Sequence, residues 1–227
     1  MNDPMQPTLP HRLTASALQL AAVALLAVLP LTLVQNLTET RRADRLGAAQ
    51  RAALAEVLSP ALHDNDLLAN RFLLDPHSSG FTSLEQLGLT EPRSAYRARL
   101  GGRVSGVILP VETALGYNGR IVLLAGIDTE GRLTGVRVVT HAETRGLGDR
   151  LEADLSPWID GFANRSLANT PAPLWRVKKD GGDFDQFVGA TITPRAVVAA
   201  IHSALLFFDA NQDSLLDAGP GRLESQP

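Results

Sequence analysis

The sequence predicts an α+β protein in which a single N-terminal transmembrane helix is followed by a mixed α+β domain. Three observations predict this architecture. Residues 13–38 contain no charged side chain, the middle of the chain holds β-rich runs separated by glycine turns, and a helical apolar pattern follows Pro194. A chain of 227 residues has room for one domain with a sizeable core plus appendages.

The composition excludes several classes of function. The formal net charge is −3, which argues against a nucleic-acid-binding protein because no basic face is implied. The chain contains no cysteine, so disulfides, thiolate catalysis, iron–sulfur ligation and haem attachment through Cys-x-x-Cys-His are excluded. Any redox chemistry would therefore need an organic cofactor or a partner protein.

After a short N-terminal segment, residues 1–12, the uncharged run 13–38 is long enough to cross a hydrocarbon core of about 30 Å as a helix. A cleaved signal peptide is the alternative. The run is longer than the usual apolar region of about 7–15 residues, and no small-x-small cleavage site follows it in the right place. We therefore predict a membrane anchor.

The charges that flank this span do not favour an exported domain. Arg12 is the only Arg or Lys before it, whereas four arginines follow it closely, at positions 41, 42, 45 and 51. The positive-inside rule would keep the following domain in the cytoplasm. A long domain can nevertheless be exported against this bias.

Residues 39–63 have the pattern of an amphipathic stalk helix that ends near Pro60. Its arginines could meet lipid phosphates, but a solvated helix face is an equally good interpretation. The domain itself is predicted at 64–210. Residues 211–227 lack a packing pattern and are predicted to be a mobile tail.

Within the domain, the residue pattern predicts strands, hairpins and two helices in a definite order. A Gly-Gly turn joins the first predicted strand pair, and the turn Asp128–Gly131 joins the second. The predicted strands are 96–100, 103–110, 120–127, 132–140 and 175–178, and the predicted helices are 151–162 and 194–208.

The start of the last predicted helix is a possible anion site. Thr193 suits the N-cap, and Pro194 suits the first helical position. The small residues before it bring the Thr191 hydroxyl to the positive end of the helix, which favours a phosphate. An ordinary helix N-terminus would explain the same residues.

A second group of residues, 141–150, follows the predicted hairpin. Gly146 and Gly148 allow the backbone to approach a flat ligand, while Thr144 offers a hydroxyl and Leu147 an apolar contact. His141 and Glu143 would supply only two metal ligands, so we predict no metal site. Gly-Leu-Gly alone is also no dinucleotide-binding motif.

Both groups resemble motifs of the FMN-binding domain family. The run from Asp185 to Thr193 resembles the flavinylation motif, in which the Thr of Gly-Ala-Thr carries FMN through a phosphoester bond. Val188 stands where many members have Ser or Thr. The run from Glu143 to Gly148 resembles the family motif Glu-Thr-Pro-Gly-Leu-Gly, with Arg145 in place of proline.

The resemblance implies a covalent FMN cofactor attached to Thr191 and no catalytic residue of the usual kind. Thr191 would act as a nucleophile only during maturation, when a separate flavin transferase attaches FMN from FAD. The residues expected around the cofactor are Thr191, Gly189, Ala190, Thr193, Asp185, Glu143, Thr144, Leu147 and Gly148.

Over about residues 10–210 the chain resembles the G-subunit family of Rnf (Rsx) ion-translocating electron-transport complexes. The single predicted span favours it over the paralogous C subunit of the sodium-pumping NADH:quinone reductase. The resemblance implies a single-pass protein of a bacterial inner membrane with a periplasmic domain. Other membrane subunits would be its partners, and its FMN would relay electrons between ferredoxin and NAD during ion translocation.

Two other classes of protein stay open on the sequence. One is a membrane-tethered module that binds a phosphate ligand reversibly at the helix N-terminus. The other is a structural subunit in which the Gly-Ala-Thr loop only precedes a helix and no flavin is bound.

Overall fold

The computed structural model describes residues 50–77 and 80–216. The predicted N-terminal segment 1–12, the predicted transmembrane helix 13–38, residues 39–49 of the predicted stalk and residues 217–227 of the predicted tail lie outside these residues. Residues 51–227 are grouped as one unit of the chain, and the first unit ends at Gln50. The following description concerns the second unit.

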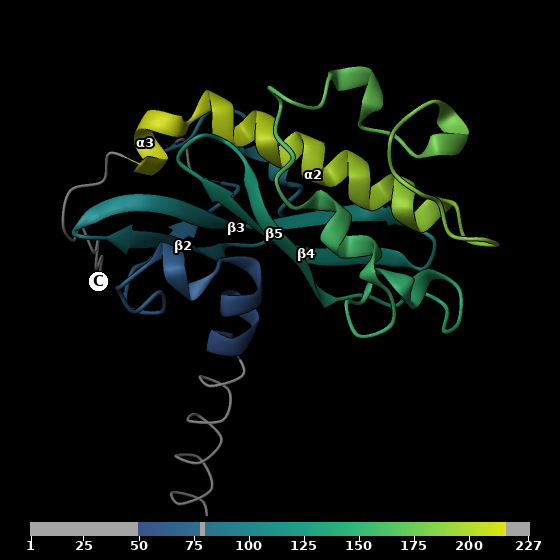
Figure 1. The fold of residues 1–227 in the computed structure, drawn as a ribbon, viewed down its shortest axis with the longest axis horizontal. Helices are drawn as coiled ribbons and strands as arrows, with labels where there is room; N and C mark the ends of the chain where they lie inside the picture. The colour runs from purple at the N-terminus through teal and green to yellow at the C-terminus, as the bar shows by residue number, and fades with distance from the viewer. Residues whose placement is uncertain (1–49, 78–79, 217–227) are drawn as a thin grey trace, which may run out of the picture. The chain divides into compact units, whose positions relative to one another are not determined.

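Five antiparallel strands form one sheet in chain order, which confirms the α+β prediction (Figure 1). The two hairpins predicted from the Gly-Gly and Asp128–Gly131 turns are both present. Gly101 and Gly102 have φ of 59° and 80°, which is why two glycines stand at the first turn. The strands are β1 Arg71–Leu74, β2 Arg93–Leu100, β3 Arg103–Gly116, β4 Gly119–Asp128 and β5 Leu133–Thr140.

β3 is longer than predicted because it continues through Pro110 to Gly116. Proline in a central strand removes a ladder hydrogen bond. The recorded pairing of β3 with β2 ends at Ile108, so Pro110 lies where β3 is paired with β4. The sequence prediction stopped at Pro110 because it could not include this change of partners.

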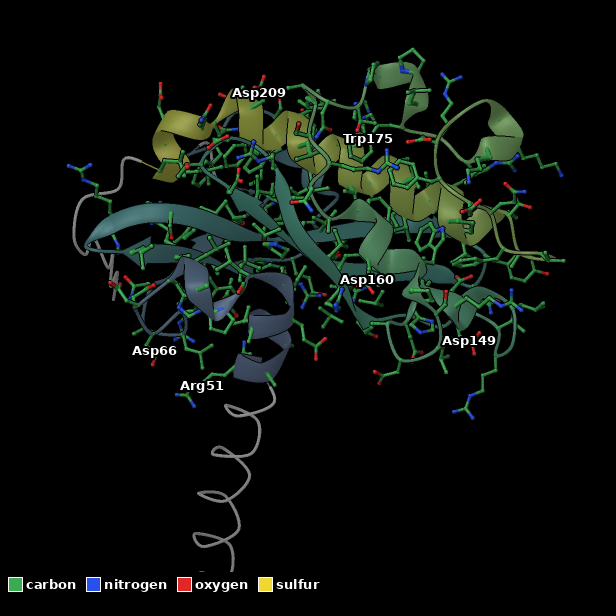
Figure 2. All side chains as sticks on the ribbon, viewed as in Figure 1. Arg51, Asp66, Asp149, Asp160, Trp175 and Asp209 are labelled. Atoms are coloured by element: carbon green, nitrogen blue, oxygen red, sulfur yellow. The ribbon has the colours of Figure 1, made fainter. Side chains whose placement is uncertain are left out.

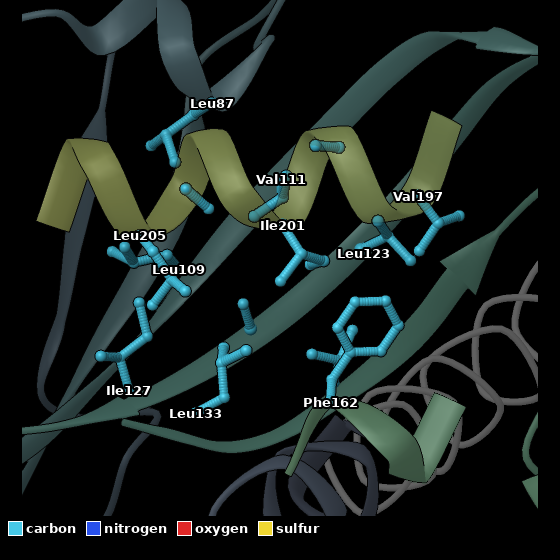
Figure 3. Close-up of a cluster of buried hydrophobic side chains, with 14 of the residues drawn as sticks. Leu87, Leu109, Val111, Leu123, Ile127, Leu133, Phe162, Val197, Ile201 and Leu205 are labelled. Carbon is cyan, nitrogen blue, oxygen red and sulfur yellow. The ribbon is translucent and has the colours of Figure 1, made fainter. Parts of the chain in front are cut away.

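Helix α2, Ile192–Ala210, lies across one face of the sheet and supplies much of the core (Figure 1). Alternate residues of β3 point toward α2, and Ile108 between them belongs to a second cluster with the helical segment 51–57. Because both faces of β3 are covered, its apolar residues form a continuous run. Figure 3 shows the main core, which includes Leu109, Val111, Leu123, Ile127, Leu133, Phe162, Val197, Ile201 and Leu205.

α2 starts two residues earlier than the sequence indicated. Thr191, not Thr193, is the N-cap, so Pro194 is the third residue of the helix. Proline is compatible with this place because the N–H groups of the first turn have no partner inside the helix. Thr193 is fully buried, and its hydroxyl makes a tertiary contact instead of a cap.

The predicted helix 151–162 is replaced by two short 3-10 helices, η3 Gly148–Leu151 and η4 Pro157–Phe162. η4 has its own start signal. Pro157 is its first residue, and Ser156 caps it, because the Ser156 hydroxyl oxygen accepts a hydrogen bond from Trp158 N at 3.2 Å. Ile159 and Phe162 of η4 are buried in the core. The apolar spacing that predicted a helix over 151–162 therefore identified buried residues correctly, but the backbone there is not a continuous α-helix.

The predicted strand 175–178 is also absent. Val177 forms an isolated bridge with Phe184, and the flanking residues form η5 Ala172–Leu174 and η6 Lys178–Asp180. Trp175 is buried, and its Nε1 donates to Thr170 O at 2.9 Å. The β-rich composition of this segment therefore reflects side-chain burial and not membership of the sheet.

Ordered structure extends beyond both predicted boundaries of the domain. At the C-terminal side, α3 Gln212–Leu216 follows α2, and Leu215 is fully buried. Asn211 is anchored to Thr82 by two hydrogen bonds of 2.8 Å. At the N-terminal side, the helical segment 51–57 and η1 Pro60–Leu62 precede Asp64. Inside the domain, η2 Leu84–Leu87 contacts α2.

Within the described part of the chain, α2 is the one helix whose length and composition would permit it to cross a bilayer. Most of its apolar stretch is buried inside the domain. We therefore assign α2 as the core helix that covers the sheet.

Candidate functional site

Three segments meet at the end of the sheet where α2 begins (Figure 1). They are the hairpin tip, residues 115–119, which comprises the end of β3, the turn and the first residue of β4; the β5 loop, residues 141–150; and the helix loop, residues 185–191. The antiparallel order brings the first two together, because the last residue of β5, Thr140, pairs with Val122 near the start of β4. Figure 2 shows the side chains of this region, with Asp149 of the β5 loop labelled.

Glu143, in the β5 loop, joins this loop to the hairpin tip and to the start of α2. One carboxylate oxygen, Oε2, accepts a hydrogen bond from the Thr193 hydroxyl at the start of α2. The other, Oε1, accepts one from Asn118 N of the hairpin tip at 3.0 Å. Glu143 is 7 % exposed, so these two bonds satisfy a carboxylate that has little access to water.

Further contacts hold the hairpin tip and the β5 loop together. The Asn118 side-chain amide donates to Ala142 O at 2.9 Å and to the Thr144 hydroxyl at 3.2 Å. Glu143 N donates to His141 Nδ1 at 3.0 Å, while His141 Nε2 lies 2.7 Å from Glu152 Oε1. Both ring nitrogens of His141 are thus occupied by protein groups. The described residues contain no group of three side chains arranged to hold a metal ion.

Gly148 lets the β5 loop approach α2 closely. A Cβ at this position would lie 2.7 Å from Glu143 Oε2, 2.9 Å from Glu143 Cβ and 3.0 Å from Thr193 Oγ1. These distances are shorter than ordinary contacts, so any side chain would displace the buried pair.

We therefore expect Gly148→Ala to lower the free energy of unfolding by about 1–3 kcal/mol, the usual cost of overpacking a close contact. Denaturant unfolding of the purified protein measures the change. Gly161→Ala is the matched control, because a Cβ at Gly161 would meet no atom within 4 Å. Equal stability of the two variants would contradict this role of Gly148.

The β5 loop contains a tight turn over residues 144–147, closed by Leu147 N donating to Thr144 O at 3.1 Å. Gly146, at the third position, has φ of 78°, as a type II turn requires. Arg145 occupies the second position, where proline is common. Arg145 is exposed and forms no hydrogen bond or ion pair with the described residues. The second position of this turn favours proline but does not require it, so the turn can hold Arg145 where the family motif has proline.

Arg145→Pro is accordingly expected to stabilise the protein by about 0.4–1 kcal/mol, because it restricts the unfolded chain without removing a native hydrogen bond. The denaturant concentration at the midpoint of unfolding should increase, while the slope of the unfolding free energy against denaturant concentration stays the same. A loss of stability would show that this position does not have the backbone conformation of a type II turn.

The helix loop leaves the Thr191 hydroxyl available. Thr191 is half-buried at the N-cap, and its side chain makes no capping bond and no other hydrogen bond to the described residues. Gly189 has φ of 83°, a conformation that favours glycine, and Ala190 N donates to Phe187 O at 3.1 Å. Of the two threonines near the start of α2, Thr193 is engaged with Glu143 and Thr191 is free.

Asp185 lies at the other end of the helix loop and faces a different set of residues. Its carboxylate pairs with Lys178 at 2.7 Å, and its backbone carbonyl accepts a hydrogen bond from Trp158 Nε1 at 2.7 Å. A cavity of about 580 Å³ lies here, lined by Arg150, Trp158, Arg165, Lys178, Asp183 and Phe187 among others. The structure therefore places Asp185 with this cavity and away from the network of Glu143.

An ion pair between Arg195 and Asp180 holds the first turn of α2. Arg195 Nη2 donates to Asp180 Oδ1 at 2.6 Å. The Arg195 guanidinium lowers the pKa of the Asp180 carboxyl, mainly through this side-chain hydrogen bond, and the carboxyl in turn raises the pKa of Arg195. The positive charge of Arg195 near the helix N-terminus is therefore balanced by a neighbouring carboxylate.

The sequence indicated the β5 loop and the helix loop but missed the hairpin tip. Gly116 and Gly119 bracket Tyr117 and Asn118, a turn signal that could have been recognised if β3 had been extended past Pro110. The bonds from Asn118 to Glu143 and Thr144 had no signal in the sequence, because they join residues that are distant along the chain.

Comparison with known proteins places these segments in one family. The family model for the FMN-binding domain matches residues 116–206, a range that begins within the hairpin tip and contains both loops. The G subunit of the ion-translocating oxidoreductase complex from Pseudomonas aeruginosa is 50% identical over 88% of this chain and 91% of its own length. Proteins of the same description from Stutzerimonas stutzeri and Shewanella loihica are 43% and 38% identical, covering 87% and 91% of this chain and 81% and 94% of their own lengths.

A solved structure described as Shewanella oneidensis NqrC aligns with 72% of this chain and 73% of its own length. The TM-score is 0.44 and the sequence identity 18%.

Proposed function

Because this chain belongs to the family of G subunits of ion-translocating oxidoreductase complexes, we propose that it relays electrons through an FMN attached covalently to Thr191. Membership makes the protein part of a multi-subunit oxidoreductase complex, with an FMN-binding domain of its own. The observation that supports the attachment point is the free hydroxyl of Thr191. The hydroxyl of Thr193 is buried and bonded to Glu143.

The residues around Thr191 fit a flavin phosphoester. The N–H groups in the first turn of α2 and the helix dipole would stabilise the remaining negative charge of the phosphate. Gly189 and Ala190 have small side chains, so they leave room for a ligand to approach the Thr191 hydroxyl. Leu147 of the β5 loop and Val188 of the helix loop are exposed and offer apolar surface to a flat ring, and the exposed Thr144 offers a polar edge.

Three of the predicted cofactor-binding residues have a different role in this proposal. Glu143, Thr193 and Gly148 lie behind the surface and contact one another, so we assign them to holding the β5 loop against α2. They would position Thr144 and Leu147, which face outward. Asp185, paired with Lys178, would fix the start of the helix loop.

The flavin supplies the redox chemistry, and the protein fixes its place and its surroundings. During maturation the Thr191 oxygen would form a bond to the phosphorus of the FMN half of FAD as the pyrophosphate bond breaks. AMP leaves, and the hydroxyl proton passes to a base of the flavin transferase. We assign no general base for this step to the present chain.

We further propose that residues 13–38 anchor the protein in a bacterial inner membrane and that the domain lies on the periplasmic side. A covalent bond is the form of attachment that prevents loss of a flavin by dilution outside the cytoplasm. Neighbouring membrane subunits would exchange electrons with this flavin while the complex couples transfer between ferredoxin and NAD to ion translocation.

Acid precipitation tests the covalent claim against the two alternatives. We expect protein produced together with its flavin transferase to keep its yellow colour in the washed precipitate. Flavin or another phosphate ligand released into the supernatant would instead support a module that binds reversibly at the start of α2. Protein without any flavin would support a structural subunit.

A further inference from the structure

We propose that the hairpin tip forms an apolar wall of the flavin site, with Tyr117 packed against the isoalloxazine ring and Leu115 beside it. This inference rests on the proposed function. It assigns to Tyr117 and Leu115 a contact with the cofactor that neither sequence motif indicates. The contact with Tyr117 can be tested by flavin fluorescence.

The hairpin tip is held rigidly against the two loops that carry the motifs. Asn118, next to Tyr117, bonds through its backbone N–H to Glu143 and through its side chain to Ala142 and Thr144. Gly116, on the other side, is so close that a Cβ there would lie 2.7 Å from Glu143 Oε1. Because Glu143 also holds Thr193, the position of the tip is fixed relative to the start of α2.

The side chains at this tip are apolar and uncovered. Leu115 is 71 % exposed and Tyr117 is 66 % exposed. Tyr117 makes no hydrogen bond and no ring contact with the described residues. Exposed large apolar side chains on a well-fixed hairpin indicate a surface that another group covers.

The other two segments expose apolar side chains as well. Leu147 of the β5 loop is 40 % exposed, and Val188 of the helix loop is 83 % exposed. The two loops also touch, because a Cβ on Gly189 would lie 3.2 Å from Leu147 Cδ2. An isoalloxazine ring is flat and largely apolar, so it gains most where aromatic and aliphatic side chains lie together. The tether at Thr191 keeps the ring near this group of residues.

The cavity beside Asp185 is the competing location, and its lining is less suitable. Two ion pairs, Lys178 with Asp185 and Arg165 with Asp183, lie in its wall. A ring placed over them would remove water from charges that are now partly solvated, and this carries a desolvation cost. The apolar surface at the hairpin tip has no such cost.

Flavin fluorescence distinguishes the two locations, because electron-rich tyrosine and tryptophan rings quench flavin emission when they are in contact with it. We expect Tyr117→Ala to increase the fluorescence yield per covalent flavin several-fold in the full-length protein. Tyr117→Phe should also increase it, because phenylalanine is a poor electron donor, while leaving the visible absorption band close to that of the wild type.

Two control variants complete the experiment. Leu100→Ala changes a half-exposed apolar residue at the β2–β3 turn, the other end of β3, and should leave the emission unchanged. Trp158→Phe removes the tryptophan that lines the cavity and should also leave it unchanged. Circular dichroism checks that each variant has the fold of the wild type.

An unchanged emission in Tyr117→Ala would overturn the proposal and would leave the hairpin tip as a surface for a neighbouring protein of the complex. An increase in Trp158→Phe alone would place the ring over the cavity and would also overturn it. In both cases the covalent flavin would still be present, so the proposed function would stand. Wild-type protein that lacks covalent flavin would instead contradict the proposed function itself.

Discussion

Thr191→Val is expected to abolish covalent flavin attachment while leaving the domain folded. Valine keeps the shape of threonine and removes the one hydroxyl that the proposal requires. Because this hydroxyl bonds to none of the described residues, the free energy of unfolding should change by less than about 0.5 kcal/mol. Flavin fluorescence of the protein band on a denaturing gel measures attachment, and denaturant unfolding measures stability.

Thr193→Val is the matched control, because it removes a hydroxyl two positions away. We expect this variant to keep its covalent flavin but to lose stability, since Glu143 Oε2 would lose its donor in a buried position. Thr191→Ser should retain the flavin, because the hydroxyl remains. Flavin still bound to denatured Thr191→Val protein, or lost selectively from Thr193→Val, would contradict the assignment of the attachment site.

Glu143→Ala is expected to lower the free energy of unfolding by about 2–4 kcal/mol, because two hydrogen bonds to a buried carboxylate are lost together. The Thr193 hydroxyl and Asn118 N–H would be left without their partner. The β5 loop and the hairpin tip should then move more freely, so flavin attachment should also decrease. Denaturant unfolding and the flavin-to-protein ratio measure the two effects separately.

The control for this variant is Glu130→Ala, which removes an exposed carboxylate that pairs with Arg132 at the β4–β5 turn. Surface ion pairs contribute little, so a loss below about 1 kcal/mol is expected. If Glu143→Ala were as stable as Glu130→Ala, the Glu143 network would not be what holds the hairpin tip, the β5 loop and the start of α2 together.

Much of the sheet could be predicted because its signals are local. The Gly101–Gly102 turn and the Asp128–Gly131 turn each lie between β-rich runs, and both hairpins are confirmed. The apolar spacing after Pro194 likewise identified α2, whose inward face packs on the sheet. Periodicity and turn chemistry are properties of neighbouring residues, so a single sequence contains them.

Features that depend on tertiary contacts could not be predicted in the same way. Thr193 is a good N-cap residue by type, yet its hydroxyl bonds to Glu143, and the helix begins two residues earlier. Trp175 and Val177 suggested a strand, but they are buried without a neighbouring strand of the sheet to pair with. In each case burial against a distant segment determined the local structure.

The candidate site shows the same division. The two motif loops were visible in the sequence, and so was the hydroxyl of Thr191. The pairing of Glu143 with Thr193 spans 50 positions, and the participation of Asn118 depends on the register of β3 with β4. The sequence could therefore name the residues of the two loops, but the structure was needed to separate those that face outward from those that hold the loops in place.

Mass spectrometry of the tryptic peptide Asp180–Arg195, from protein purified from its own host, tests the central claim most directly. The peptide contains both threonines, and trypsin can release it by cleavage after Lys179 and Arg195. We predict a mass increase equal to FMN less water, with fragments that place it on Thr191. A peptide recovered only in its unmodified form, from protein whose denatured band shows no flavin fluorescence, would contradict covalent electron transfer through this residue.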